Sequence, residues 1–269
     1  MEAARTTYEC LLYQVSDGIA TLTLNRPDRL NALGGSLRAD LFDAVTRAGA
    51  DPDVRVMVLT GAGKGFCAGG DVKAMAEANA GRRERPLIEK IAPGRDRTLL
   101  AMREAPQPII AAVNGAAVGA GMNLALGCDI RIASTEAKFS QAFVKRGLHP
   151  DWGGTYFLPR VVGMAKACEM IFTGDPIDAV EALRLGIVNR VVAPQDLLPA
   201  AYELARRIAA GPPVAIRLAK RSLYANADLD LRGALVVETM AQNVCFETED
   251  AAEGIRAFGE KRAPVFRGR

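Results

Sequence analysis

Residues 54–71 read VRVMVLTGAGKGFCAGGD, and the pattern of these residues predicts the fold class. Its first part, residues 54–60, is a short valine-rich run, which is typical of a strand covered on both faces. Five glycines follow within residues 61–70, and the chain then enters a helical pattern. A buried strand, a glycine-rich turn and a helix, in that order, predict an α/β fold with largely parallel strands.

The same order of elements recurs further along the chain. Residues 108–113 are a second apolar strand, and residues 119–126 are a helix opened by glycines. The spacing also predicts a helix over residues 86–103. Residues 79–85 are polar and basic, and we expect them to form a solvated loop. The repetition strengthens the prediction of alternating strands and helices.

The N-terminal residues predict a hairpin followed by one helix. Residues 8–15 and 19–24 are rich in strand-forming residues, and Asp17-Gly18 supplies the turn between them. Ser36 is the expected N-cap of a helix that ends at Asp51-Pro52. The alternation of side chains over residues 19–24 predicts that one face of the hairpin is buried.

The composition of the chain changes after residue 196. Four helices with no strand between them are predicted, over residues 200–210, 213–224, 231–245 and 248–258. A helical layer that follows an α/β core often packs against a partner subunit. We therefore expect residues 1–196 to form the core and residues 197–269 to form a C-terminal helical oligomerisation region.

Composition and charge exclude several classes of protein. The 269 residues include 34 Lys and Arg against 31 Asp and Glu, so the formal charge of 34 − 31 = +3 argues against a nucleic-acid partner. Apolar runs fall far short of the ~20 residues of a membrane span, and no apolar run follows the N-terminal charges as in a secretory signal. Five scattered cysteines and one histidine argue against a disulfide framework or a metal site. We expect a cytoplasmic protein without a metal.

The two glycine-rich turns point to one kind of chemistry. Neither residues 59–71 nor residues 113–123 contain the phosphate-binding pattern GxxxxGK[ST], and the first lacks GxGxxG. Glycine lets the backbone come close to a ligand, and the start of a helix leaves N–H donors unpaired. Two such turns could hold a developing oxyanion between their backbone N–H groups.

Four motifs resemble the enoyl-CoA hydratase/isomerase (crotonase) superfamily. They are Asn25-Arg26-Pro27 with Asn31-Ala32-Leu33, Phe66 to Asp71, Asn114-Gly115 to Gly121, and Cys128 to Ala133. The resemblance implies an α/β spiral of ββα units over residues 1–196, a trimerisation region over residues 197–269, and a homotrimer or a homohexamer built as a dimer of trimers. It also implies an acyl-CoA thioester substrate, with coenzyme A as part of the substrate and no separate cofactor. The oxyanion donors would be the N–H groups of Gly70 and Ala120.

The same resemblance implies a set of contacts with coenzyme A. They fall on Arg29, Ala68, Asp71, Val72 and Lys73, with Phe258 and Lys261 reaching the nucleotide of a neighbouring subunit. Other readings stay open at this point. Asp71 has the pattern of a helix N-cap, Arg29 and Lys73 have that of solvated surface charges, and Phe258 has that of a core residue.

This chain departs from the hydratase branch of the family, because Asn123 and Phe143 stand at the positions that match its two glutamates. Asn123 cannot move a proton, and Phe143 can only shape the pocket. Asp151, which follows the lone His149, resembles the single aspartate of family members that isomerise acyl-CoA. Alternative roles stay open for these residues. Asp151 could instead cap the next helix, and His149 could orient Asp151 or line the pocket. Asn123 could form a hydrogen bond with the substrate or with Asp151, or it could only pack within its helix.

We expect a one-base isomerisation in which Asp151 removes a proton, the turns hold the enolate, and the proton returns to another carbon. Hydration by Asp151 with an ordered water is the alternative, and an aspartate nucleophile ranks below it. A non-catalytic, RNA-binding member is also conceivable, with residues 82–85 (RRER) as the basic cluster, although the cluster lacks aromatic side chains for stacking bases.

Overall fold

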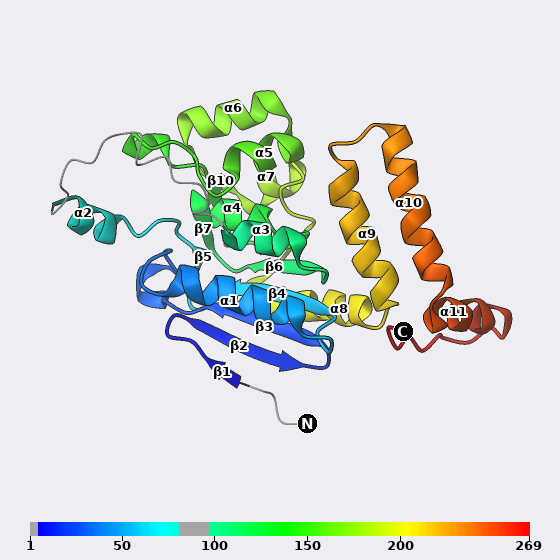
Figure 1. Ribbon diagram of the computed structural model, residues 1–269. Helices are drawn as coiled ribbons and strands as arrows, with labels where there is room; N and C mark the ends of the chain where they lie inside the picture. The colour runs from blue at the N-terminus through cyan, green and yellow to red at the C-terminus, as the bar shows by residue number, and fades with distance from the viewer. Residues whose placement is uncertain (1–4, 81–96) are drawn as a thin grey trace.

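The computed structural model describes residues 5–80 and 97–269 and contains two sheets (Figure 1). The larger sheet has the strand order β1-β2-β3-β4-β6-β8-β11, and the smaller has the order β10-β9-β7-β5. The strands are β1 (Arg5–Thr7), β2 (Leu11–Ser16), β3 (Ile19–Leu24), β4 (Val56–Gly61), β5 (Gly65–Cys67), β6 (Ile109–Val113), β7 (Ala116–Val118), β8 (Ile130–Ser134), β9 (Lys138–Ser140), β10 (Ile177–Asp178) and β11 (Arg190–Val192). Pairing from β3 through β11 in the larger sheet is parallel, as expected.

The described helices are α1 (Leu37–Ala50), α2 (Val72–Ala80), α3 (Arg97–Glu104), α4 (Ala120–Leu126), α5 (Gly154–Val162), α6 (Met164–Thr173), α7 (Ala179–Arg184), α8 (Leu197–Ala209), α9 (Pro213–Asn226), α10 (Leu231–Phe246) and α11 (Glu249–Gly259). All four helices predicted after residue 196 are present. Within residues 5–80 and 97–269, no helix combines the length and the apolar character needed to cross a membrane.

The two sheets are built from a repeated unit. One strand of the unit enters the large sheet, the next enters the small sheet, and a helix follows, as in β4-β5-α2 and β6-β7-α4. In the main core, α1 packs on β2 and β3 of the large sheet and on α3, and α4 packs on β5 and β7 of the small sheet. The opposite face of the large sheet packs Val56, Val58 and Ile110 against α8 through Leu197 and Ala201. The repetition confirms the predicted ββα units.

The predicted hairpin and helix are present, with two differences: the first hairpin strand begins at Leu11 and not at residue 8, and Ser36 makes no side-chain cap. β2 and β3 pair antiparallel across the Asp17-Gly18 turn, and α1 begins directly after Ser36. The Ser36 hydroxyl accepts no bond from the helix, since the Ser36 backbone is in the helical region and not in the extended conformation of an N-cap, and the hydroxyl donates to the Asp40 carboxylate at 2.8 Å. Ser36 therefore marks the start of the helix without making the side-chain cap that we predicted.

Two sequence predictions fall partly outside the described residues. The predicted helix over residues 86–103 is seen only as α3, because residues 81–96 are not described. The predicted loop at residues 79–85 is wrong at its start, since Asn79 belongs to α2, and the rest of it lies outside the described residues. The basic cluster at residues 82–85 lies there as well.

A buried ionic cluster joins α9 to the core. The Lys220 ammonium lies 2.9 Å from the Asp129 carboxylate and donates to the backbone carbonyls of Met102 and Gln107 at 3.1 and 2.9 Å. The Tyr224 hydroxyl donates to the same carboxylate. Burial lowers the pKa of Lys220 and raises that of Tyr224. Asp129, part of one family-like motif, thus anchors a C-terminal helix.

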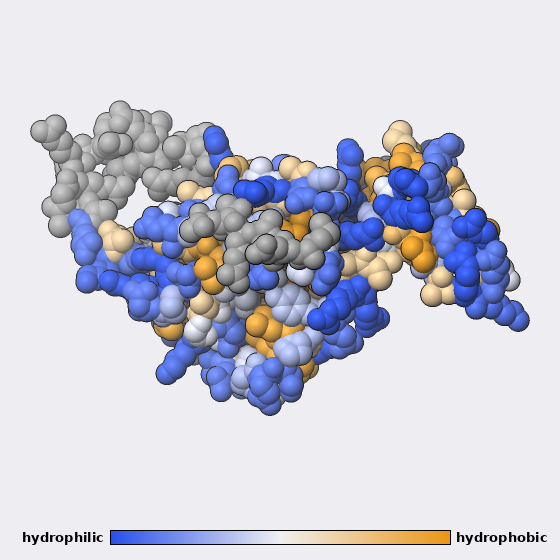
Figure 2. Space-filling view, turned by 90° about the horizontal axis from the view of Figure 1, so that it is seen from below, coloured by the Kyte–Doolittle hydropathy of each residue, from blue (hydrophilic) through white to orange (hydrophobic). Residues whose placement is uncertain are grey.

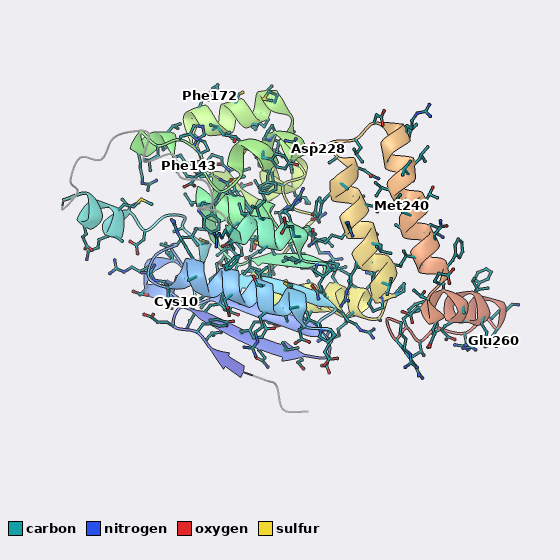
Figure 3. All side chains as sticks on the ribbon, in the orientation of Figure 1. Cys10, Phe143, Phe172, Asp228, Met240 and Glu260 are labelled. Atoms are coloured by element: carbon teal, nitrogen blue, oxygen red, sulfur yellow. The ribbon has the colours of Figure 1, made fainter. Side chains whose placement is uncertain are left out.

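Helix α10 lies away from the sheets and leaves an apolar face uncovered. In Figure 1, α9 and α10 stand side by side, away from α5 and α6. α10 has no buried residue in this chain, and Leu231, Leu235, Val236 and Met240 on it are all exposed. Figure 2 shows hydrophobic surface at this end of the molecule, and Figure 3 labels Met240 on α10.

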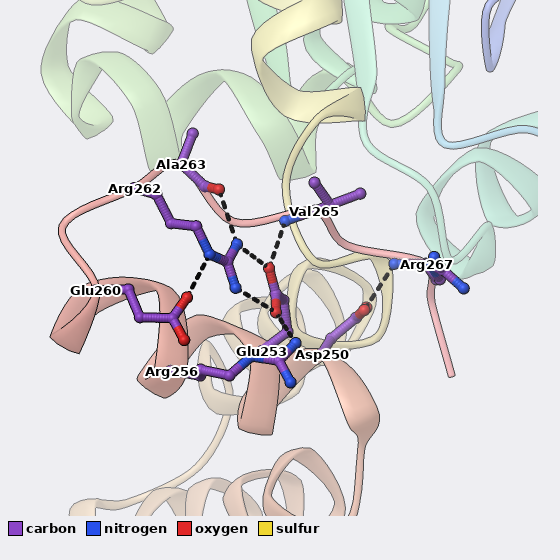
Figure 4. A network of polar contacts seen from close by, with 8 residues as sticks. All are labelled: Asp250, Glu253, Arg256, Glu260, Arg262, Ala263, Val265 and Arg267. Carbon is purple, nitrogen blue, oxygen red and sulfur yellow. Dashed lines mark hydrogen bonds and ion pairs between the residues drawn. The ribbon is translucent and has the colours of Figure 1, made fainter.

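The chain end folds back onto α11 through a charged network (Figure 4). The Glu253 carboxylate accepts hydrogen bonds from Arg262 at 2.6 Å, from Arg256, and from the N–H of Val265 at 3.1 Å. The Asp250 carboxylate accepts from the N–H of Arg267 at 2.6 Å. The two guanidinium groups hold the pKa of Glu253 well below its ordinary range.

Candidate active site

A cavity of about 510 Å³ opens where the two glycine-rich turns meet the segment that carries Asp151. The sequence-predicted residues on its wall are Ala68, Gly70, Val72, Ala120, Phe143 and Asp151. These residues come from the turn after β5, the first residue of α2, the start of α4 and the loop between β9 and α5. Segments far apart in the sequence therefore form one site.

The two turns approach so closely that one of them needs glycine. Gly69 has φ +87°, and a Cβ there would lie 2.5 Å from the Val118 carbonyl oxygen and 3.4 Å from the Ala120 nitrogen. The Leu33 N–H donates to the Gly69 carbonyl at 2.7 Å and fixes the first turn. Gly70 and Ala120 both line the cavity, and within the described part of the chain neither N–H donates a hydrogen bond to protein. Both donors are thus available to a ligand oxygen.

The second turn is fixed from both sides. The Gly119 N–H donates to the Ser140 carbonyl of β9 at 2.7 Å. α4 lies against β5, so that a Cβ on Gly121 would stand 1.9 Å from the Cys67 carbonyl oxygen. Because backbone packs directly on backbone here, the position of the Ala120 N–H is set by the fold and not by flexible side chains.

The Asp151 segment is held by a buried pair of amides. The Asn123 amide donates from Nδ2 to the Asp151 backbone carbonyl at 2.7 Å, and Gln141 donates to Asn123 Oδ1 at 2.7 Å. Asn123 and Gln141 are both 0% exposed. Trp152 has φ +50° and is buried, while the Asp151 side chain is exposed on the cavity wall. Of the readings left open for Asn123, the structure shows the bond to Asp151.

The predicted coenzyme A contacts divide into two groups. Ala68 and Val72 line the cavity, whereas Arg29 and Lys73 are exposed outside its wall. Asp71 accepts the Ala74 N–H at 3.2 Å and pairs with Arg26 at 3.0 Å, and these contacts, the backbone bond first, lower its pKa. Asp71 therefore has the geometry of an N-cap for α2, which was the alternative reading of this residue.

Phe258 and Lys261 lie far from the cavity of their own chain. Both belong to the α11 end of the molecule, opposite α2 in Figure 1. Phe258 is 88% exposed, so the reading of Phe258 as a core residue is wrong. Their contact with the nucleotide of a neighbouring subunit stays a prediction.

Sequence reasoning missed several residues of the cavity wall. Arg38, Met75, Arg146 and Leu148 line it, and His149 does so too, as one of its two expected roles required. The Phe143 ring, labelled in Figure 3, lies against Gly119 beside the Ala120 N–H. Helical spacing placed Arg38 in the first turn of α1 but gave no signal that this turn faces the site. Within the described residues, no group of three or more His, Cys, Asp or Glu side chains could hold a metal ion.

The comparisons with known proteins agree with this geometry. A model of the family described as Enoyl-CoA hydratase/isomerase matches residues 14–269. The chain is 42% identical over 259 residues to the (E)-benzylidenesuccinyl-CoA hydratase of Thauera aromatica, covering 95% of this chain and 98% of the relative. It is 38% identical over 271 residues to the 1,2-epoxyphenylacetyl-CoA isomerase of Escherichia coli, covering 97% and 99%.

A solved structure of an enoyl-CoA hydratase subunit from Geobacillus kaustophilus superimposes with a TM-score of 0.91 at 36% identity, covering 98% of this chain and 100% of that one. The chain therefore belongs to the enoyl-CoA hydratase/isomerase family, the crotonase superfamily, and is an enzyme of that family. Both kinds of activity occur among the relatives' names, so membership does not choose between hydratase and isomerase.

Proposed function

We propose that this enzyme isomerises an acyl-CoA thioester and that Asp151 moves the proton. The observation that carries the proposal is the cavity wall, on which Asp151 is the one carboxylate among the described residues. Asn123 and Phe143 stand where the family's hydratase branch has glutamates. Asn123 is buried behind Asp151, and Phe143 presents a ring to the cavity. A single carboxylate suits a reaction that takes one proton and returns it.

The chain supplies both halves of such a reaction. In a 3-enoyl-CoA, the Asp151 carboxylate removes a proton from the saturated carbon next to the thioester carbonyl, and the electron pair of the C–H bond moves onto the carbonyl oxygen to form a dienolate. The N–H groups of Gly70 and Ala120 stabilise that oxyanion, and each such donor contributes roughly 3 kcal/mol in a dry site. Protonated Asp151 then returns the proton to a different carbon, which moves the double bond and restores the carboxylate.

The remaining site residues have roles that rest on the family resemblance. Ala68 and Val72 would contact the pantetheine part of coenzyme A, with Arg29, Asp71 and Lys73 nearby. The charge that develops in the reaction is held by N–H groups, so we propose no cofactor besides the coenzyme A of the substrate.

Oligomerisation would use the C-terminal helices. The exposed apolar residues of α10 would be covered in a homotrimer or in a dimer of trimers, and Phe258 and Lys261 would reach a neighbour's nucleotide. The division into a core of residues 1–196 and an oligomerisation region of residues 197–269 stays a prediction, as does a cytoplasmic location.

Hydration is a second candidate, favoured by the name of the Thauera relative, a hydratase 42% identical to this chain. In that reaction Asp151 would activate an ordered water, which adds to the double bond. Product analysis by mass spectrometry separates the two functions. Incubation of 3-enoyl-CoA and 2-enoyl-CoA with the enzyme should interconvert them at unchanged mass.

A gain of one water in the product would refute the isomerase and support the hydratase. The Asp151→Asn variant is the control, because it keeps the shape of the side chain and loses the base. Turnover that survives in this variant at the wild-type rate would refute the role of Asp151 under either function.

A further inference from the structure

Two arginines line the cavity, and one of them, Arg38, is drawn partly out of water by the fold. Arg38 lines the cavity together with Gly70, Ala120 and Asp151, and its side chain is partly buried. Across residues 5–80 and 97–269, no carboxylate makes an ion pair with its guanidinium. Removing a guanidinium from water costs free energy, and proteins normally offset that cost with an opposite charge. The fold alone does not account for a charge at this position.

The helix that carries Arg38 does not stabilise it either. Arg38 is the second residue of α1, where the unpaired N–H groups of the helix start repel a positive side chain. Asp40, the acidic residue of the same turn, accepts instead from the Ser36 hydroxyl and from the Cys10 N–H, both at 2.8 Å. An anion brought in by a ligand would therefore meet both Arg38 and the positive end of α1.

The guanidinium is held in place so that its outer edge stays available. Its Nε donates to the Leu33 carbonyl at 3.3 Å, and its Cζ lies 5.8 Å from the centroid of the Trp152 ring. These contacts fix the stem and one face of the group, and the terminal Nη1 and Nη2 have no acceptor within the described residues. Two parallel N–H donors of this kind match the two oxygens of a carboxylate.

We propose that Arg38 binds a second carboxylate on the acyl group, so that the substrate is the coenzyme A thioester of a dicarboxylic acid. This inference rests on the proposed acyl-CoA function and narrows its substrate class. Trp152, on which Arg38 stacks, directly follows Asp151, so a carboxylate bound by Arg38 lies close to the carbon that reacts. Arg146 also lines the cavity but is exposed, so water screens its charge.

Equilibrium binding tests the inference without requiring turnover. The probes are glutaryl-CoA and adipoyl-CoA, which end in a carboxylate, against pentanoyl-CoA and hexanoyl-CoA, which have the same chain lengths and end in a methyl group. Titration calorimetry should show that the wild-type enzyme binds at least one carboxylate-ended thioester about tenfold more tightly than its methyl-ended match, as a charged hydrogen bond to a partly buried group predicts. High salt should reduce the preference.

Arg38→Met should abolish the preference while leaving the affinity for pentanoyl-CoA and hexanoyl-CoA within about threefold, because the pocket keeps its volume. Arg47→Met is the matched control, since Arg47 is also on α1 and stacks on an aromatic ring, with its Cζ 5.9 Å from the Tyr13 ring centroid, but lies outside the cavity wall. This control should keep the preference.

Two results would overturn the inference alone. One is equal binding of both matched pairs by the wild-type enzyme, which needs no variant to fold. The other is a preference that survives Arg38→Met. Failure of all four thioesters to bind would instead refute the acyl-CoA function, and the inference with it. If only the inference fails, Arg38 stabilises the fold or positions Asp151, and Arg38→Met should lower the turnover of every substrate by the same factor.

Discussion

Replacing Gly69 with alanine measures how closely the two turns must approach. At φ +87° an L side chain costs about 1–2 kcal/mol of conformational strain. The new Cβ would lie 2.5 Å from the Val118 oxygen, and since such contacts are normally roughly 3.3 Å, the Val118–Ala120 turn must move by about 0.8 Å. Displacements of this size cost about a hundredfold in rate when they disturb reacting geometry.

We therefore expect Gly69→Ala to lower kcat/KM about a hundredfold and the free energy of unfolding by about 2–4 kcal/mol. Gly186→Ala is the control, because Gly186 has φ +74° but no atom within 4 Å of the new Cβ. It should lose only the strain energy, about 1–2 kcal/mol, and keep its activity. The assays are urea unfolding and steady-state kinetics, and equal activity of the two variants would refute the reasoning about the paired turns.

Three further predictions concern the C-terminal half. Lys220→Met leaves the buried Asp129 carboxylate without its counter-ion, so unfolding should become easier by about 3–5 kcal/mol and α9 should lose protection in hydrogen exchange; unchanged protection would contradict the anchoring role. The pKa of Glu253 is depressed below its ordinary 4.5, so its contacts should persist through pH 4.5 and be lost as the pH falls through the folded value. The rate at which a protease cleaves residues 263–269 should rise as the pH falls and these contacts are lost, and Glu253→Gln should remove this pH dependence. Met240→Glu places a charge on the exposed apolar face of α10 and should shift sedimentation from the proposed oligomer to a monomer. Unchanged sedimentation would contradict the proposal that this face is an interface.

Local sequence patterns predicted the elements that have a continuous apolar run or a helical repeat of apolar residues. β4 and β6 are short apolar runs, and α8 to α11 follow helical spacing, so each is visible without knowledge of the rest. The small sheet was not predicted, because its strands have two or three residues and carry no periodicity. Strands this short are stabilised by pairing across the chain, which a local pattern does not record.

The backbone groups of the site could be predicted from the sequence. Gly70 and Ala120 follow from the turns and the family motifs, and the structure brings both to one cavity with Asp151. The contact of Gln141 with Asn123 and the entry of Arg38 into the cavity depend on tertiary packing between distant segments. A polar side chain in such a position looks in the sequence like any surface residue.

The central claim is that Asp151 carries the proton from one carbon of the thioester to another. Turnover of 3-enoyl-CoA in deuterated water, followed by mass spectrometry of the recovered thioesters, tests it most directly. Because the Asp151 side chain is exposed, the proton that it takes up exchanges with deuterium from the solvent before it returns to the substrate. Wild-type enzyme should therefore introduce deuterium without adding water, and Asp151→Asn should reduce that exchange to the uncatalysed rate while still binding the substrate. Exchange that continues in Asp151→Asn at the wild-type rate would contradict the account.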